Sequence, residues 1–321
     1  MKKHLVSAAV LLSLAFLGLV FVPQNHSVCD GFLPENDLKI PVGDVNALGI
    51  DQASFNAVLD RVEKLYTPII AAKGGKLVVN RRWDDATVNA SANQQGSTWF
   101  INMYGGLARH QAISAEGFAL VACHEIGHHI GGFPKISGRW ATNEGGADYF
   151  ATLKCLRQVF TGSENTAALD PVAVKACGEL FPEAGARKLC ESNGMAGMSV
   201  AVLFQALRKQ PTPPTFGTPD PSVVTRTNDA HPDTQCRLDT YFQGGLCTKP
   251  VSEDVSNSAP APGACTVANG FTAGIRPRCW YKAPAGQEAP AMVSRPSTAP
   301  SVKTVGESLE ALRKALAGSG R

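Results

Sequence analysis

The pattern His124-Glu125-Ile126-Gly127-His128 constrains this chain more than any other feature of its sequence. Residues four apart lie on one face of an α-helix, so both imidazoles can reach a single metal ion. Apolar residues at helical spacing predict a buried helix that begins at Ser114 and ends at Gly131. The adjacent His129 points about 100° away around the helix and is not expected to bind the same ion. A second element must therefore bring a further ligand to this face.

Glu144 is the best candidate for that ligand. It lies sixteen residues beyond His128, and the glycines and the proline between them allow the chain to turn back. Asp148, one helical turn after Glu144, is placed to accept a hydrogen bond from a ligand imidazole. Because a catalytic zinc site has three protein ligands and one open position, the residues predict one zinc ion (Zn²⁺) on His124, His128 and Glu144.

These residues also have plainer interpretations. The alternative for His124, Glu125 and His128 is an exposed polar helix face, and a structural zinc site is another. Closed structural sites favour cysteine ligands, which are not found at the required spacing here. The alternative for Glu144 and Asp148 is a pair of acidic residues favoured at a helix start by the helix dipole. The match between the histidine pair and the two acidic residues favours the metal site.

The rest of the chain predicts an α+β fold, mainly α, with a small β-sheet beside the metal-binding helix. Apolar residues three and four apart predict an amphipathic helix over Asp51–Lys73. Lys76–Val79 and Ser97–Met103 predict strands, with a turn expected in the polar segment Ser91–Gly96. Further helices are expected at about 142–160, capped by Thr142 or Asn143, and at 170–181, 183–191 and 198–209.

The N-terminus predicts export. Lysines at the start are followed by the apolar run Leu5–Val22, the arrangement of a signal segment. Cleavage of residues 1–28, an uncleaved anchor and a lipid on Cys29 all remain open, although Val28 stands where lipoprotein signals carry a small residue. A periplasmic, envelope-anchored or secreted protein is expected, with membrane contact only through the N-terminal segment or a lipid on Cys29.

Nine cysteines fit an oxidising compartment, where disulfides persist. Proximity in sequence suggests three local pairs: Cys177 with Cys190, Cys236 with Cys247, and Cys265 with Cys279. Cys155 is then left to reach Cys29, and Cys123 is expected as a free thiol in the core. The unpaired cysteine is therefore either Cys123 or a lipid-bearing Cys29.

The composition divides the chain into four parts. Residues 1–28 form the signal peptide or anchor, 29–50 an N-terminal segment, and 51–247 the metal-binding domain. Residues 248–321 are rich in proline and predict a flexible tail with a possible small disulfide loop. An isolated helix over Val305–Ala317 within it would either cap the tail or dock on a partner.

The motifs resemble those of one peptidase family. His124-Glu125-x-x-His128 with Glu144-x-x-Ala147-Asp148 is similar to the gluzincin zinc metallopeptidases, in particular the HtpX-type and Oma-type (Ste-type CAAX protease-like) group. Val88–Ala92 resembles the edge strand of that group, and His231-Pro232 with Arg237-Leu238 resembles its late motif. The resemblance covers about Asp51 to Phe242, and the transmembrane helices of several members are absent. It therefore implies an exported soluble member with a zincin-type domain.

The resemblance also implies roles for individual residues. Zinc would be held by His124, His128 and Glu144, with Glu125 as the general base. His231 would donate a hydrogen bond to the developing oxyanion, and Arg237 would hold Asp148 or nearby carboxylates in place.

The edge strand, with Asn89, Ala90, Ser91 and Ala92, would bind an extended substrate by strand addition. The alternative for His231 and Arg237 is a loop histidine and a salt-bridged arginine, since a His-Pro pair alone is a weak motif.

These features predict a zinc-dependent endopeptidase that hydrolyses peptide bonds of envelope or extracellular proteins. Two alternatives stay open: a non-catalytic, zinc-stabilised scaffold or chaperone of the envelope, and a zinc hydrolase acting on cell-wall peptides. Thirty basic residues against 27 acidic ones leave little excess charge to neutralise phosphates, so nucleic acid is not an expected partner. The expected partner is a protein or peptide substrate.

Overall fold

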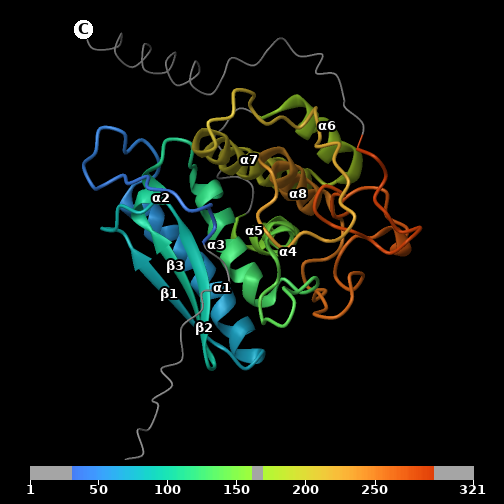
Figure 1. The fold of residues 1–321 in the computed structure, drawn as a ribbon, viewed down its shortest axis with the longest axis horizontal. Helices are drawn as coiled ribbons and strands as arrows, with labels where there is room; N and C mark the ends of the chain where they lie inside the picture. The colour runs from blue at the N-terminus through green and yellow to red at the C-terminus, as the bar shows by residue number, and fades with distance from the viewer. Residues whose placement is uncertain (1–30, 161–168, 293–321) are drawn as a thin grey trace, which may run out of the picture.

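The computed structural model describes residues 31–160 and 169–292 (Figure 1). The described part is mixed α+β and mainly helical, with one small sheet, as the sequence predicts. The sheet and helix α1 (Gln52–Ala72) lie on one side of helix α3 (Ala115–Ile130), and the remaining long helices lie on the other (Figure 1). The predicted leader, Cys29 and the predicted helix 305–317 fall outside the described residues.

The sheet has three strands in the order β1-β3-β2. β1 (Lys76–Arg82) pairs in parallel with β3 (Thr98–Tyr104), and β2 (Ala90–Gln95) pairs antiparallel with β3. The turn predicted at Ser91–Gly96 is wrong, since most of this segment forms β2 and only Gly96 and Ser97 make the turn. Ala90 and Ala92 are buried in the core while Ser91 and Asn93, which alternate with them, are only partly buried, which is the pattern of a half-buried strand.

Helix α1 confirms the amphipathic helix predicted at this position. The side chain of Asp51 caps it by accepting a hydrogen bond from the Ser54 amide at 2.8 Å. Its apolar face packs on β1 and α3, with Phe55, Leu59 and Val62 fully buried. The short helix α2 (Gly105–Arg109) follows β3 and leads to α3.

Helix α3 lies at the centre of the fold. Ser114 caps it by accepting from the Gly117 amide, as its position in the sequence suggests, and every residue from Glu116 to Ile130 is buried. It contacts the sheet, α1, α4 (Glu144–Phe150) and α7 (Ala184–Leu207). Its polar residues are therefore held away from bulk water, which strongly affects their protonation.

The helices after α3 differ in part from the prediction. α4 continues through a π-helical turn, η1 (Ala151–Cys155), into α5 (Leu156–Val159), close to the predicted helix, and α6 (Pro171–Leu180) matches the next one. The two helices predicted at 183–191 and 198–209 form the single helix α7, because the small residues between them stay helical and let α8 (Thr234–Leu246) approach closely. α8 itself was not predicted.

Four disulfides join the described residues: Cys123–Cys155, Cys177–Cys190, Cys236–Cys279 and Cys247–Cys265. The Cys177–Cys190 prediction is confirmed. The predictions of Cys236–Cys247, Cys265–Cys279, Cys155–Cys29 and a free Cys123 are wrong. Cys236 and Cys247 lie near opposite ends of α8, about 16 Å apart by helical rise, which is too far for a bridge. Cys29 lies outside the described residues.

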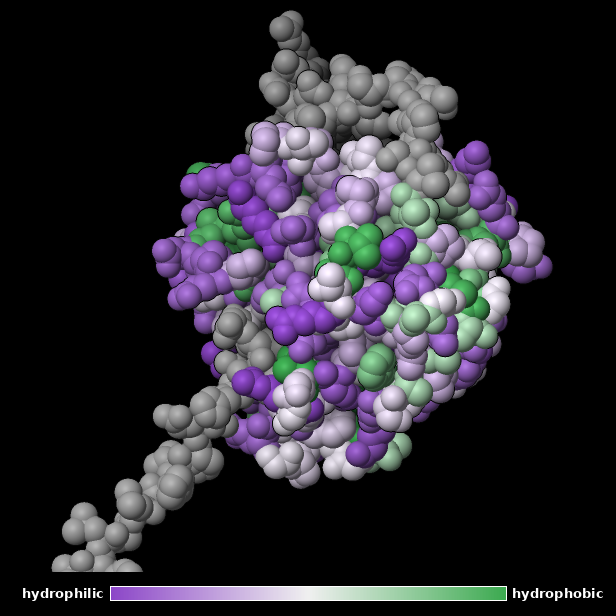
Figure 2. Space-filling view, turned by 45° about the vertical axis from the view of Figure 1, so that its right-hand side comes forward, coloured by the Kyte–Doolittle hydropathy of each residue, from purple (hydrophilic) through white to green (hydrophobic). Residues whose placement is uncertain are grey.

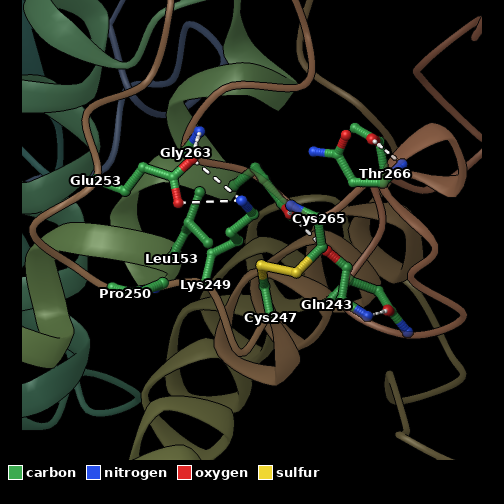
Figure 3. Close-up of a disulfide and its surroundings, with 12 residues drawn as sticks. Leu153, Gln243, Cys247, Lys249, Pro250, Glu253, Gly263, Cys265 and Thr266 are labelled. Carbon is green, nitrogen blue, oxygen red and sulfur yellow. Dashed lines mark hydrogen bonds and ion pairs between the residues drawn. A yellow bond between two sulfur atoms is a disulfide. The ribbon is translucent and has the colours of Figure 1, made fainter.

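Residues 248–292 differ from the flexible tail expected there. Two of the bridges tie this segment to α8, and Figure 3 shows Cys247–Cys265 beside Glu253, which binds Lys249 and accepts from the Gly263 amide. The Trp280 side chain is fully buried against α4. A 3₁₀ turn, η2 (Val267–Asn269), adds the only helical geometry within residues 248–292. The segment therefore forms part of the wall behind α4.

The apolar residues are mainly internal. On the face drawn in Figure 2, hydrophobic residues form small patches separated by polar ones. Within residues 31–160 and 169–292, no helix combines the length and the hydrophobicity needed to cross a bilayer.

The packing of Trp280 on α4 gives a first prediction. A Cβ at Gly145 would lie 2.2 Å from the Trp280 indole, so Gly145→Ala should force the ring outward and lower the free energy of unfolding by about 1–3 kcal/mol. Gly178→Ala in α6 is the control, since its Cβ meets only the side chain of Arg187 at 3.9 Å. It should be neutral or stabilising by up to about 1 kcal/mol. Urea unfolding with disulfides intact measures both, and equal stability of the two variants would contradict the packing.

Candidate metal centre

Three side chains from two helices converge below the sheet. His124 and His128 come from α3, and Glu144 is the first residue of α4. His124 Nε2 lies 3.3 Å from Glu144 Oε2, and His128 Nε2 lies 3.6 Å from Glu144 Oε1. One ligand atom from each residue lies within 4.8 Å of the others, and all three side chains are buried. The structure therefore brings together the three residues predicted as ligands.

The loop between the two helices sets this geometry through main-chain contacts. The Thr142 amide donates to the His128 carbonyl at 2.9 Å, which folds the loop back onto α3. Asn143 caps α4 by accepting from the Gly146 amide. A carbonyl oxygen only accepts, so the 2.8 Å contact between His128 Nδ1 and Thr142 O places the proton on Nδ1. The His128 Nε2 lone pair is then directed at Glu144.

Asp148 orients the other imidazole. Its Oδ1 lies 2.7 Å from His124 Nδ1 and 2.6 Å from Arg237 Nη2. The carboxylate thus accepts from His124 Nδ1 and leaves Nε2 as a donor of electrons to a metal. Burial opposes the charge on Asp148, but Arg237 and His124 together hold its pKa below the ordinary value. Arg237, on α8, is fully buried and also contacts the Tyr241 hydroxyl.

The donor set and its unpaired atoms fit a divalent metal ion. Among the described residues, His124 Nε2, Glu144 Oε2 and both Glu125 carboxylate oxygens are buried without a hydrogen-bond partner. Burying such atoms unpaired costs free energy, and a cation between the imidazoles and Glu144 would satisfy the first two. Two imidazole nitrogens and one carboxylate are ligands that suit zinc and similar divalent ions.

The charges of the centre are strongly coupled. Burial opposes ionisation of Glu144, but His128 and His124 hold its pKa well below the ordinary value. Burial also raises the pKa of Glu125 to about 8, with His124 and Arg237 acting in the opposite direction. Glu125 is therefore a carboxylate that binds a proton near neutral pH, whereas the neighbouring Glu144 stays negatively charged.

His231 lies at the margin of the centre. Its Nε2 is 3.3 Å from Glu144 Oε2 and 2.9 Å from the carbonyl oxygen of Gly31, to which it donates. Its side chain is 18% exposed, whereas those of His124 and His128 are fully buried. The structure thus places this predicted residue beside the ligands, although it comes from the loop before α8.

The predicted substrate strand contacts the chain's own N-terminal segment. Ala90 O accepts from the Phe32 amide at 2.8 Å, and Asn89 Oδ1 accepts from the Leu33 amide at 2.9 Å. The Phe32 ring also meets the His124 ring edge-on at 4.8 Å. Ser91 and Ala92 follow on β2, where Ala92 is buried. Nothing in the local sequence marks Phe32 as a neighbour of the centre, so these contacts were not predicted.

His129 faces away from the centre, as expected from helix geometry. Its ring stacks between Trp99 and Trp140, at 5.4 and 4.8 Å, and its Nε2 donates to the Phe100 carbonyl. It therefore links α3 to β3 and to the loop before α4.

Comparison of the chain with protein-family models, with curated proteins and with solved structures finds no match.

The geometry predicts metal binding by one face of α3 only. The wild-type protein should bind about one zinc ion per chain, and Glu144→Gln should abolish most of this binding. His129→Asn is the matched control, because its ring points to Trp99 and Trp140, and the variant should keep the metal even if it is less stable. Elemental analysis of dialysed, folded protein measures bound zinc. Loss of zinc from the His129 variant equal to that from the Glu144 variant would contradict this assignment.

Proposed function

We propose that this protein is an exported zinc-dependent endopeptidase of the gluzincin type, similar to the HtpX-type and Oma-type group. The observation that carries the proposal is the unpaired Glu125 carboxylate, buried next to His124, His128 and Glu144. A structural metal site needs three or four ligands, but it does not need a further carboxylate, that of Glu125, which has no hydrogen-bond partner among the described residues. A peptidase needs that residue as its base.

The arrangement of elements supports the same proposal. The helix carrying the histidine pair lies under a small sheet with an outer strand, β2, and the third ligand begins the next long helix. This order and layout are compatible with a zincin-type domain. The four disulfides support export, because such bridges persist in oxidising compartments.

The proposed chemistry assigns a task to each residue. A zinc ion bound by His124, His128 and Glu144 would supply Lewis acidity, activating water and polarising the scissile carbonyl. Glu125 takes the proton from the attacking water and later delivers it to the leaving amine. Its raised pKa of about 8 suits both steps, because the group accepts and releases a proton near neutral pH.

Two further residues support the reaction. His231 Nε2 donates a hydrogen bond to a carbonyl oxygen next to the ligands, as an oxyanion donor must. Arg237 acts through Asp148, whose carboxylate keeps His124 in the tautomer that binds metal.

A zinc-stabilised scaffold or chaperone is the second candidate. The observation that favours it is burial: His124, Glu125 and His128 are fully buried and Glu144 is 3% exposed, as in a closed structural site. A scaffold has no use for Glu125 as a base, so one substitution separates the two functions.

The proposal predicts that Glu125→Gln keeps zinc and fold but lowers kcat/KM for an unfolded protein substrate by about 10²–10⁴-fold, the usual contribution of a general base. Glu116→Gln, on the same helix near its first turn, is the matched control and should hydrolyse like the wild type. Hydrolysis is measured by mass spectrometry of released peptides. Undiminished cleavage by the Glu125→Gln protein would exclude this mechanism. The same comparison is made in a chain that also carries Gly31→Ala.

A further inference from the structure

The N-terminal segment Gly31–Leu33 lies along the edge that a substrate would use. The Phe32 amide donates to Ala90 O, and the Leu33 amide and carbonyl both bond to the Asn89 side chain, at 2.9 and 3.3 Å. The segment runs antiparallel to this edge, since Lys39 pairs antiparallel with Thr87 further along. It therefore occupies Ala90 O, a main-chain acceptor that strand addition of a peptide would use.

The same segment also engages the proposed catalytic groups. The Gly31 carbonyl accepts from His231 Nε2 at 2.9 Å, in place of a substrate carbonyl. The Phe32 carbonyl accepts from Arg237 Nη1 at 3.1 Å, while the other nitrogen of that guanidinium binds Asp148. Two consecutive carbonyls, that of the Gly31–Phe32 peptide bond and the one after it, are thus bound by residues placed around the metal ligands.

The Phe32 side chain fills an aromatic pocket. Its ring is fully buried and lies edge-on to His124 at 4.8 Å and to Phe204 at 5.4 Å, with the Arg237 guanidinium 4.5 Å from its centroid. This pocket suits a large aromatic side chain, which fills it and packs against the guanidinium, whereas a short side chain would leave it partly empty.

We propose that Gly31–Leu33 is an internal ligand of the substrate site and holds the peptidase in a latent form. This inference rests on the proposed function. A competing peptide needs Ala90 O, the Asn89 side chain and the pocket of Phe32, and all three are occupied. The ligand side chains are buried, so an extended chain reaches them only after this segment leaves.

The chain next to the segment allows it to leave without unfolding the domain. Residues 34–39 are partly or fully exposed, and main-chain contacts resume at Leu38, whose carbonyl accepts from the Val88 amide at 3.3 Å, and continue to Ile40. Ile40 donates to Ala86 O and accepts from Arg109 Nε at 2.8 Å, independently of the contacts of Phe32. Residues 31–33 can therefore exchange with another peptide while the anchor at Ile40 stays in place.

Two glycines in this region give a matched pair of variants. Gly31 has φ +108°, and a Cβ there would lie 2.6–2.9 Å from the Asn89 side chain. Gly43 has φ +80°, but its Cβ would meet nothing within 4 Å. Both Ala variants introduce backbone strain, but only Gly31→Ala disturbs the contact of this segment with Asn89.

The first test measures binding without catalysis. In the Glu125→Gln background, a labelled peptide copy of residues 31–36, Gly-Phe-Leu-Pro-Glu-Asn, is titrated and followed by fluorescence anisotropy. We expect the Gly31→Ala protein to bind it at least about ten times more tightly than the Gly43→Ala protein, since its site is released more often. A peptide with Ala in place of Phe leaves the pocket empty and should bind both proteins much more weakly. Equal affinities in the two variants would overturn the inference.

A second engineered protein provides the test if Gly31→Ala folds poorly. A protease recognition sequence inserted between Asp37 and Leu38, in the exposed stretch, allows the segment to be cut loose from folded protein. The cut protein should bind the peptide copy more tightly than the uncut protein, and equal binding would again overturn the inference.

Hydrolysis separates this inference from the proposed function. With Glu125 intact, the Gly31→Ala and cut proteins should cleave peptides at least about ten times faster than the Gly43→Ala and uncut proteins. Tighter peptide binding with no hydrolysis in any form would support occupancy by the segment and overturn the peptidase function. Hydrolysis that is equally fast in all forms would overturn latency and support the peptidase.

Discussion

The candidate centre depends on one buried carboxylate, that of Asp148. Moving a carboxylate out of water costs several kcal/mol, and only good geometry with a positive partner offsets it. Arg237 and the ring N–H of His124 both contact the same oxygen, at 2.6 and 2.7 Å. Since these groups come from α4, α8 and α3, the pairing sets how three helices meet. It also determines which nitrogen of His124 faces the metal ligands.

The disulfides enclose this helix junction. Cys123–Cys155 joins α3 to the helical turn after α4, immediately beside His124 in sequence. Cys236–Cys279 joins α8 to the segment whose next residue, Trp280, packs on Gly145. Both bridges restrict the unfolded chain and so favour the state in which the three helices are together. The proline-rich segment 248–292 thereby contributes to the wall behind α4.

The sequence predicts the parts of this centre that rest on local spacing. The ligand positions follow from His124, His128 and Glu144, because helix periodicity and the turn between them decide which side chains face one another. Helix α8 has a weak apolar pattern and is stabilised by contacts with distant helices, so it was missed. The polar sequence of β2 locally reads as a turn, and only the family resemblance indicated an edge strand, over Val88–Ala92. The prediction of the cysteine pairs was wrong for the same reason, since three of the four bridges join elements that only the complete fold brings together.

Burial and catalysis make opposite demands on this centre. Ligands on core helices are held precisely, and low dielectric strengthens their charges, but a protein substrate must still reach them. Different segments of the fold meet these two demands, precise ligand placement and substrate access. The ligands lie on α3 and α4, which are packed on all sides, whereas Gly31–Leu33 covers them from a stretch followed by exposed residues. Access can therefore change through the movement of a few N-terminal residues, while the geometry of the ligands stays the same.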